Sequence, residues 1–173
     1  MPIINLSTTI EAPIEICFDL SRSIELHQLS TSQSNERAIA GLTSGLIGLD
    51  EEVTWEATHF GIRQTLSSKI TAFEFPTFFR DEMVRGVFKM LKHDHRFERS
   101  GDVTIMSDAF EFESPAGIFG ILVNKVGLTD YLRNLLLERN RVIKEFAETQ
   151  RWKDILLKKI KGDPKNQQKY TGF

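Results

Sequence analysis

Apolar and polar residues alternate along the middle of the chain, and turn residues interrupt the alternation at regular intervals. A two-residue turn at Gly101-Asp102 would fold this region into a hairpin. Its apolar face would pair Phe97 with Met106, His95 with Asp108, His93 with Phe110, and Leu91 with Phe112. The other face is polar and sets Lys92 against Glu111. Because a shift of one residue would mix the two faces, the pattern predicts this register.

Two further hairpins sort their residues in the same way. A turn at Phe60-Gly61 would pair Val53 with Ser68, Trp55 with Leu66, and Ala57 with Gln64. A turn at Phe75-Pro76 would pair Ser68 with Met83, Ile70 with Asp81, and Ala72 with Phe79. Both registers place Glu52, Lys69 and Glu82 side by side on the polar face. The pattern predicts a curved antiparallel sheet of about six or seven strands, with its convex face in water.

The N-terminal region predicts one strand and two short helices. Residues 3–10 are rich in β-forming residues. The segment 11–26 carries Pro13 at the start of apolar residues at helical spacing, which predicts a first helix. A second short helix is expected from Ser23 to Ser32. The segment 41–48 carries three glycines and predicts a loop.

A long apolar stripe at helical spacing predicts a cover for the apolar face of the sheet. It runs from about Ala116 to Ile160, directly after Pro115, and includes Leu132 and Leu136. We expect Trp152 in the last turns of this helix. The amphipathic end 152–161 could alternatively touch a membrane or a partner.

The composition is that of a globular domain. The chain has 173 residues, of which 40% are hydrophobic and 27% are charged. We expect a single domain over residues 1–160 and a polar, frayed tail over 161–173. The net charge is −2, and basic residues alternate with acidic ones, so we expect no nucleic acid as partner. No segment approaches the roughly 18 apolar residues of an integral membrane segment.

The single cysteine, Cys17, can form no intramolecular disulfide and is expected to be a packed core thiol. This fits a reducing compartment. The N-terminal residues lack the basic and apolar regions of a secretory signal. We therefore expect a cytoplasmic protein.

Three segments resemble a known superfamily: VTWEATHFG (53–61), FFRDEMVRGVFKMLKHDHRFE (78–98) and VTIMSDAFEFESPAGIFG (103–120). With the predicted order of elements, they are similar to the START/Bet v 1-like superfamily. The similar branch is the bacterial SRPBCC group, which includes polyketide cyclases and lipid-transfer proteins. The resemblance covers about residues 2–150. It implies the helix-grip fold, an α+β architecture in which a curved sheet wraps a long C-terminal helix, with a cavity between them.

The predicted inward faces indicate what would line that cavity. An apolar space with a few converging polar groups is typical of a small-molecule site. The candidate ligand-binding residues are Trp55, Gln64, Leu66, Ser68, Phe79, Asp81, Met83, His93, His95, Phe97, Met106, Asp108, Phe110, Leu132 and Leu136. The resemblance implies a lipid, quinone or polyketide-like ligand. A carrier or sensor is the first hypothesis, a cyclase- or dehydratase-type enzyme the second, and a protein-binding module the third.

Three interpretations of His93 and His95 stay open. They could bind a metal ion with Asp108 as third ligand, but His27 and His59 lie on other predicted elements. We therefore expect neither a metal nor another cofactor. A His95–Asp108 pair could instead act as a catalytic acid and base. The favoured interpretation is that Asp108 satisfies His95 or helps to recognise a ligand.

Two further expectations concern neighbouring residues. His93 faces an apolar residue in the predicted register, so we expect it to lack a carboxylate partner. Asp81 and Arg85 share one strand face, so they are expected to form an ion pair at the cavity rim. Neither a glycine-rich phosphate loop after a strand nor a G-x-S-x-G motif occurs in the chain.

Overall fold

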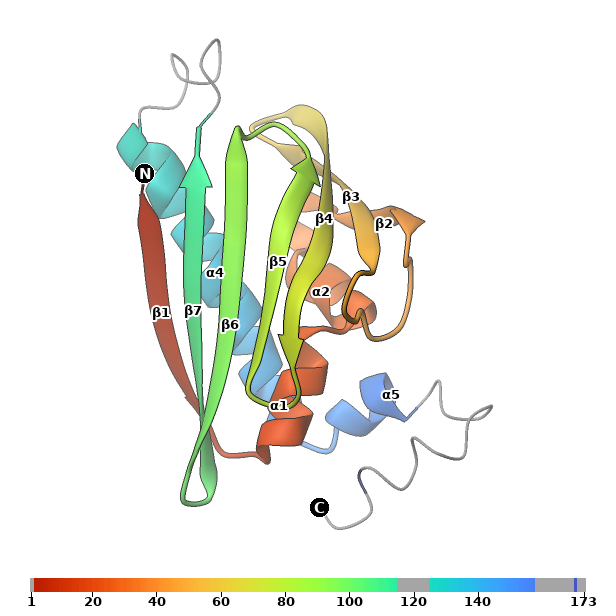
Figure 1. The fold of residues 1–173 in the computed structure, drawn as a ribbon, viewed down its shortest axis with the longest axis vertical. Coiled ribbons are helices and arrows are strands. Elements are labelled where there is room, and N and C mark those ends of the chain that lie inside the picture. The colour runs from red at the N-terminus through yellow and green to blue at the C-terminus, as the bar shows by residue number, and fades with distance from the viewer. Residues whose placement is uncertain (1, 115–124, 158–169, 171–173) are drawn as a thin grey trace.

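Seven antiparallel strands form one curved sheet in the computed structural model, which describes residues 2–114, 125–157 and 170 (Figure 1). The order across the sheet is β1-β7-β6-β5-β4-β3-β2, so the first and last strands are neighbours. The strands are β1 (Ile3–Ile10), β2 (Arg37–Gly41), β3 (Glu52–His59), β4 (Ile62–Glu74), β5 (Phe78–Arg85), β6 (Met90–Ser100) and β7 (Val103–Glu113).

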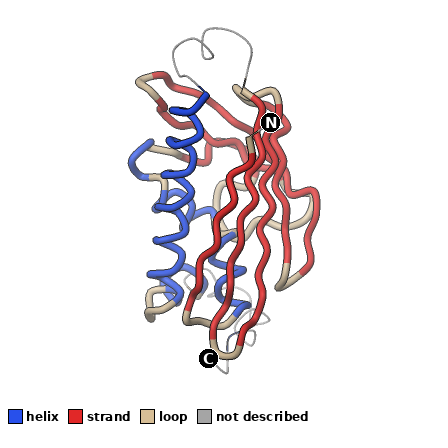
Figure 2. Tube along the Cα trace, turned by 90° about the vertical axis from the view of Figure 1, so that its left-hand side faces the viewer, coloured by secondary structure: helices blue, strands red, loops and turns tan. Residues whose placement is uncertain are grey.

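The helices lie on the concave side of the sheet (Figure 2). They are α1 (Ile14–Ser21), α2 (Ile24–Ser30), the short 3-10 helix η1 (Ser32–Ser34), α4 (Lys125–Ala147) and α5 (Trp152–Leu156). The arrangement confirms the α+β class and the helix-grip architecture. In the described part of the chain, no helix combines the length and apolarity needed to cross a membrane.

The break between α1 and α2 has a local cause. Pro13 precedes α1, where its missing N–H costs nothing. Ser23 then caps α2, because its hydroxyl oxygen accepts a hydrogen bond from the Leu26 N–H at 3.2 Å. The segment 11–26 therefore forms one helix and the start of a second.

The three predicted hairpin registers are confirmed, with one exception. His95 lies opposite Asp108, and Trp55 lies opposite Leu66. The exception is Ala72, which pairs with Arg80 instead of Phe79, because the register of β4 shifts between Ile70 and Ala72. Strict alternation could not reveal this extra residue. Beyond the shift, Phe73 pairs with Phe79.

The C-terminal part of the chain differs from the expected single long helix. The expected start at Pro115 lies outside the described residues. α4 ends at Ala147, so Trp152 belongs to the separate helix α5. The Thr149 hydroxyl donates to the Glu145 carbonyl at 2.8 Å, a side-chain bond that competes with continued helix. The expectation for Trp152 was therefore wrong.

Tyr170, in the tail expected to be frayed, is buried. Its hydroxyl donates a hydrogen bond to the buried Asp19 carboxylate of α1. Its ring lies 5.7 Å from that of Trp152, between centroids. At this residue the tail is docked on α1 and α5. The rest of 161–173 lies outside the described residues.

Phe18 of α1 is the centre of an aromatic cluster in the core. Its side chain is fully buried, and its ring contacts four others edge-on. The centroid distances are 5.3 Å to Phe73, 5.2 Å to Phe75, 5.4 Å to Phe79 and 5.3 Å to Phe97. The register shift in β4 contributes to this cluster, because it sets Phe73 directly opposite Phe79.

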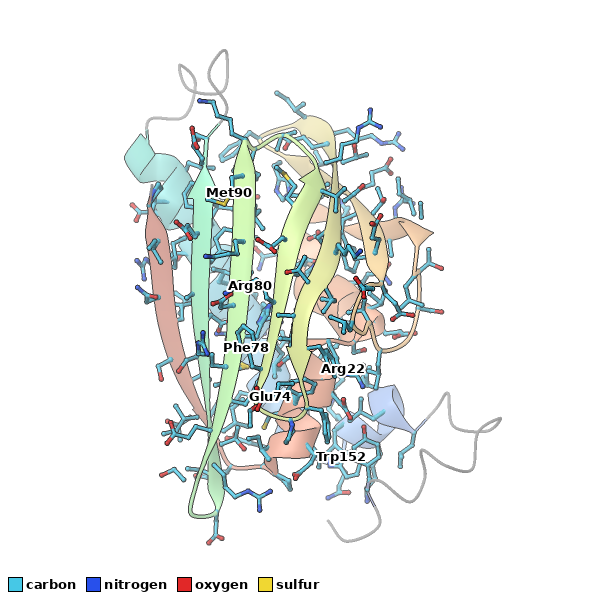
Figure 3. The ribbon with its side chains drawn as sticks, in the orientation of Figure 1. Arg22, Glu74, Phe78, Arg80, Met90 and Trp152 are labelled. Atoms are coloured by element: carbon cyan, nitrogen blue, oxygen red, sulfur yellow. The ribbon has the colours of Figure 1, made fainter. Side chains whose placement is uncertain are left out.

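The convex face of the sheet is polar, as predicted. Glu52, Lys69 and Glu82 are cross-strand neighbours on β3, β4 and β5. Lys69 Nζ forms an ion pair with Asp50 Oδ1 at 3.0 Å. Arg80 lies on the same face (Figure 3). Its Nε atom lies 2.5 Å from Asp94 Oδ1. Charged side chains therefore cover the convex face, while the helices pack on the concave face.

We expect Phe18→Ala to lower the free energy of unfolding by about 3–5 kcal/mol, because it leaves a hole where four rings meet. Lys69→Ala removes a partly exposed ion pair and should cost less than about 1 kcal/mol. Urea denaturation of both variants measures the difference. A Phe18→Ala cost no larger than that of Lys69→Ala would contradict the placement of the core.

Cys17 should be inert in the folded protein. Its side chain is fully buried, and burial raises the pKa of its thiol to about 12, so little thiolate is present at neutral pH. Ellman's reagent at pH 8 should label it only after a denaturant is added. Stoichiometric labelling of the native protein, at the rate of a free thiol, would show that α1 does not pack as described.

Candidate functional site

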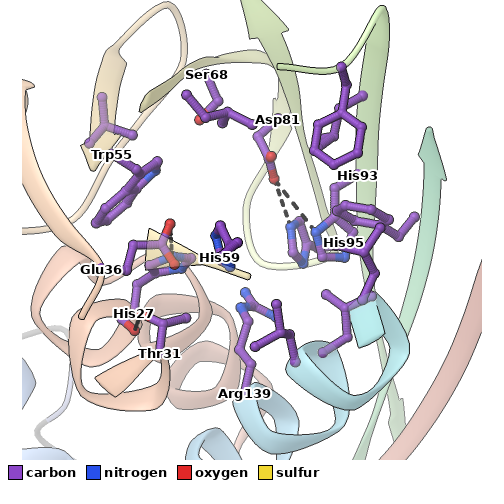
Figure 4. A pocket seen from close by; sticks show the side chains of 18 of the residues that line it. His27, Thr31, Glu36, Trp55, His59, Ser68, Asp81, His93, His95 and Arg139 are labelled. Atoms are coloured by element: carbon purple, nitrogen blue, oxygen red, sulfur yellow. Dashed lines mark hydrogen bonds and ion pairs between the residues drawn. The ribbon is translucent and has the colours of Figure 1, made fainter. Parts of the chain in front are cut away.

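A cavity of about 240 Å³ lies between the concave face of the sheet, α2 and α4 (Figure 4). Its wall is mainly apolar, with polar side chains gathered in two groups. Of the residues predicted to bind a ligand, those that line it are Trp55, Gln64, Leu66, Ser68, Phe79, Asp81, His93, His95, Phe110, Leu132 and Leu136.

Four predicted residues do not line the cavity, although they share the inward face. Phe97 packs on Phe18, and Met106 is fully buried with its sulfur 3.4 Å from the Ser21 hydroxyl. Met83 packs against a core cluster of Ile4, Leu91, Phe110, Phe112 and Leu136, near Gly86. Asp108 lies behind the histidines. Strand parity gives the face on which a side chain lies, but α1 and α4 decide which part of that face stays open.

Asp108 is the partner of both histidines on one side. His93 Nε2 lies 2.9 Å from Asp108 Oδ1 and forms a hydrogen bond with it. His95 Nδ1 lies 3.1 Å from the same oxygen. The predicted proximity of His95 and Asp108 is confirmed, whereas the expectation that His93 lacks a carboxylate partner was wrong. The reason is that Asp108 is the diagonal neighbour of His93 on the adjacent strand, and the long imidazole side chain can reach it.

Asp81 flanks the same histidines on the cavity side. His95 Nε2 lies 2.9 Å from Asp81 Oδ2, and His93 Nδ1 lies 4.0 Å from it (Figure 4). The expected ion pair of Asp81 with Arg85 was therefore wrong, since Arg85 is exposed at the end of β5. The two imidazoles and the two carboxylates form one cluster, which we call the His–Asp cluster: Asp81, His93, His95 and Asp108.

α4 joins this cluster through two neighbouring side chains. Asn140 Nδ2 donates to Asp108 Oδ2 at 2.7 Å. Arg139 Nη1 lies 3.6 Å from Asp108 Oδ1, and its Nη2 donates to the Ser21 carbonyl at 2.9 Å. Both side chains are buried. The sequence analysis did not identify these two residues. Their signal was that they are polar residues beside the apolar positions of the long helix.

The two carboxylates of the cluster stay ionised and His93 stays neutral. Burial disfavours ionisation of Asp108, but the imidazoles of His93 and His95 hold its pKa well below the usual value. Burial also opposes ionisation of Asp81, yet the hydrogen bond from His95 leaves its pKa lowered. Burial and the nearby His95 lower the pKa of His93 to about 4, against the pull of Asp108.

The imidazoles are part of a row of rings along the concave wall. Phe79 stacks on His95 at 4.1 Å between centroids, and His95 lies 3.7 Å from His93. Phe110 meets His93 edge-on at 5.1 Å. Each ring is held by its neighbours, so the histidines have little freedom to turn.

A second polar group lines the cavity between α2, β3 and α4 (Figure 4). His27 Nε2 lies 3.4 Å from Glu36 Oε1, and the His27 ring stacks on Trp55 at 4.2 Å. His59 Nδ1 forms a 2.7 Å hydrogen bond with the Tyr131 hydroxyl. We call His27, Glu36, His59 and Tyr131 the second polar cluster. The sequence analysis placed His27 and His59 only on other elements than His93 and His95, and did not bring this group together.

Within the second polar cluster, burial and neighbouring charges shift the pKa values of three side chains. Burial would raise the pKa of Glu36, but His27 outweighs it, and the pKa is lowered. Burial lowers the pKa of His59. Burial and the charge of Glu36 raise the pKa of Tyr131, so its hydroxyl remains a hydrogen-bond donor at neutral pH.

Comparisons with known proteins give likeness in structure alone. No protein-family model matches the chain, and no curated protein matches it significantly. Among solved structures, TTHA0849 from Thermus thermophilus superposes with a TM-score of 0.64 at 18% identity, covering 82% of this chain and 97% of its own. The major latex-like protein 151 from Panax ginseng superposes with a TM-score of 0.61 at 14% identity, covering 86% and 98%.

The chain has the fold of the START/Bet v 1-like superfamily. CV1439 from Chromobacterium violaceum, at a TM-score of 0.62 and 10% identity over 86% of this chain and 99% of its own, has the same arrangement. At identities of 10–18%, these superpositions establish the fold alone.

Asp108→Ala should lower the free energy of unfolding by at least about 1–3 kcal/mol, because His93 and Asn140 lose a buried acceptor. The control is Glu113→Ala on the same strand, which removes an exposed pair with Lys89 and should cost less than about 1 kcal/mol. Chemical denaturation compares the two. Equal, small costs would mean that Asp108 does not tie α4 to the sheet.

Proposed function

We propose that the protein binds a small, mainly apolar molecule in its cavity, as a carrier or sensor. The observation that carries this proposal is a mainly apolar space with polar clusters at two sides of it. Small-molecule sites have this form, because apolar contact supplies affinity and a few polar groups fix orientation. The volume of about 240 Å³ favours a compact ligand over a long-chain lipid.

The polar clusters favour a ligand with polar atoms at both ends. Asp81, which is 23% exposed at its side chain, presents a carboxylate that accepts hydrogen bonds. Arg139 lines the same part of the wall and can donate to a ligand oxygen. On the other side, His59 and Tyr131 offer a donor and an acceptor. A hydroxylated aromatic, a quinone or a polyketide-like molecule fits these demands.

A cyclase- or dehydratase-type enzyme is the second candidate. The observation that favours it is that His95 lies between two carboxylates and lines the cavity. Such an imidazole can move a proton to or from a bound carbonyl compound. In this candidate function His95 is the acid or base, and Asp108 and Asp81 position it. A third candidate, a protein-binding module, has no comparable observation in its favour.

Native mass spectrometry of gently purified protein should show a bound small molecule, which solvent extraction then identifies. Leu136→Trp places an indole in the cavity and should weaken binding of that molecule about tenfold or more, or about 1.4 kcal/mol. Leu137→Trp is the matched control, since Leu137 is 48% exposed on the next position of α4. Equal affinities of the two variants would exclude the cavity as the binding site.

Trp55 should report on the cavity. It lines the wall and is 7% exposed, whereas Trp152 packs on Tyr170 away from it. In a Trp152→Phe variant, emission comes from Trp55 alone and should be blue-shifted. Quinones and hydroxylated aromatics should change it saturably. A flat response to a broad panel of such compounds, together with an empty protein in native mass spectra, would contradict the binding function.

The enzyme candidate predicts a different result. His95→Gln would then abolish turnover of a polyketide-like substrate while the substrate still binds. If the variant loses binding and turnover in equal measure, His95 recognises the ligand and does no chemistry.

A further inference from the structure

We propose that Asp81, His93 and His95 form a binding site for one divalent transition-metal ion in the wall of the cavity. The three side chains come from the adjacent strands β5 and β6. Each offers a ligand atom, and these atoms lie within 4.8 Å of one another. The proposal goes beyond ligand binding and is tested without knowledge of any ligand.

The spacing of the ligand atoms suits a single ion. Asp81 Oδ2 lies 2.9 Å from His95 Nε2 and 4.0 Å from His93 Nδ1. Two atoms that each lie about 2.0–2.2 Å from one zinc ion stand about 3–3.5 Å apart. The His95–Asp81 separation is already close to this range, and the other ligand atoms, all within 4.8 Å of one another, would have to draw together around the ion. The strands hold the side chains in this arrangement before any ion arrives.

Asp108 fixes the tautomer that a metal requires. Its Oδ1 atom accepts a hydrogen bond from His93 at 2.9 Å, so the Nε2 atom of His93 carries the proton in this contact. In neutral His93 the lone pair is then on Nδ1, the nitrogen nearer to Asp81. Metal-binding histidines usually donate their other N–H to a carboxylate in this way. Asp108 thus acts as the outer partner of the site rather than as its third ligand.

His95 adds an independent observation. Its side chain is 2% exposed, and its Nδ1 atom has no hydrogen-bond partner among the described residues. That atom lies 3.1 Å from Asp108 Oδ1, outside hydrogen-bond geometry. While Nε2 donates to Asp81, a neutral ring turns the Nδ1 lone pair toward a carboxylate, which is unfavourable. A cation bound at Nε2 would place the ring proton on Nδ1 and so remove this repulsion between the lone pair and Asp108.

The charges around the cluster favour a cation. Within the described residues, Asp81 and Asp108 are two negative groups, and Arg139, at 3.6 Å from Asp108, is the positive group beside them. Two carboxylates thus face one guanidinium in a poorly solvated place. A divalent ion reverses the sign and leaves a positive centre that faces the cavity. An anionic ligand oxygen or a hydroxide would complete it.

The donor set selects the class of metal. Two imidazole nitrogens and one carboxylate oxygen suit Zn²⁺, Fe²⁺ or Co²⁺, while Mg²⁺ and Ca²⁺ prefer oxygen ligands throughout. Three protein ligands leave at least one coordination position, and all three residues line the cavity. The rival to this proposal is a proton on His95, which would satisfy both carboxylates without any metal.

The test is titration of chelator-stripped full-length protein with Co²⁺ and Zn²⁺. We expect one ion per chain by calorimetry, and visible d–d absorption from Co²⁺ that Zn²⁺ abolishes. Asp81→Asn, His93→Ala and His95→Ala should each weaken binding more than about 100-fold, and Asp108→Asn about 10–100-fold. The control is Asp94→Asn, which removes a carboxylate between the two histidines in sequence but on the convex face, where it binds Arg80. It should bind as the unchanged protein does.

Imidazole ¹⁵N resonances give a readout that needs no variant. Zn²⁺ should shift Nδ1 of His93 and Nε2 of His95 to positions typical of metal-bound nitrogen, and leave those of His59 unchanged. Several results would overturn the proposal: no ion bound by the stripped protein, equal loss in Asp94→Asn and Asp81→Asn, or no shift of either nitrogen. Hydrophobic ligand binding could survive any of them, so the two proposals fail separately.

Discussion

The Asp108 carboxylate is the constraint on which the arrangement of sheet, helix and cavity depends. It is almost fully buried and accepts bonds from His93 on the neighbouring strand and from Asn140 on α4. A buried carboxylate without partners is too costly to tolerate, so α4 must lie where Asn140 and Arg139 can reach it. The helix that covers an apolar wall could otherwise slide along it, because apolar contact has little direction. The polar contact therefore gives the helix its register on the sheet.

The sheet could be predicted from the sequence because its information is local. Side chains in a strand alternate with period two, so one turn position fixes every pair that follows. The pairing of His95 with Asp108 and of Trp55 with Leu66 was obtained in this way. The prediction broke at Ala72, where an extra residue changes the parity of β4. Nothing in the residues around Ala72 indicates an extra residue. The contacts of Phe73 and Phe79 with Phe18, which accompany the shift, involve a distant helix.

The candidate site was predicted in part, for a reason of the same kind. Residues of the concave wall, such as Phe79 and His95, follow from parity. Which carboxylate meets which imidazole depends on distances of a few ångströms across three strands, and both Asp81 and Asp108 turned out to reach the pair. Arg139, Asn140 and Tyr131 come from a helix far away in the sequence, and their positions follow from packing. Sequence reasoning therefore gave the wall of the cavity but not the polar contacts that close it.

The row of rings from Phe79 through His95 and His93 to Phe110 has a consequence for observation. Stacked aromatic rings generate local magnetic fields that displace the proton resonances of any group held against their faces. Leu132 and Leu136 line the same cavity, so methyl groups there serve as internal probes of the wall. The proton resonances of a bound molecule would be shifted by the rings. The resonances of leucine methyl groups that it moved away from the rings would be shifted less. The architecture thus supplies a spectroscopic label at the place where one is needed, without any chemical modification of the chain.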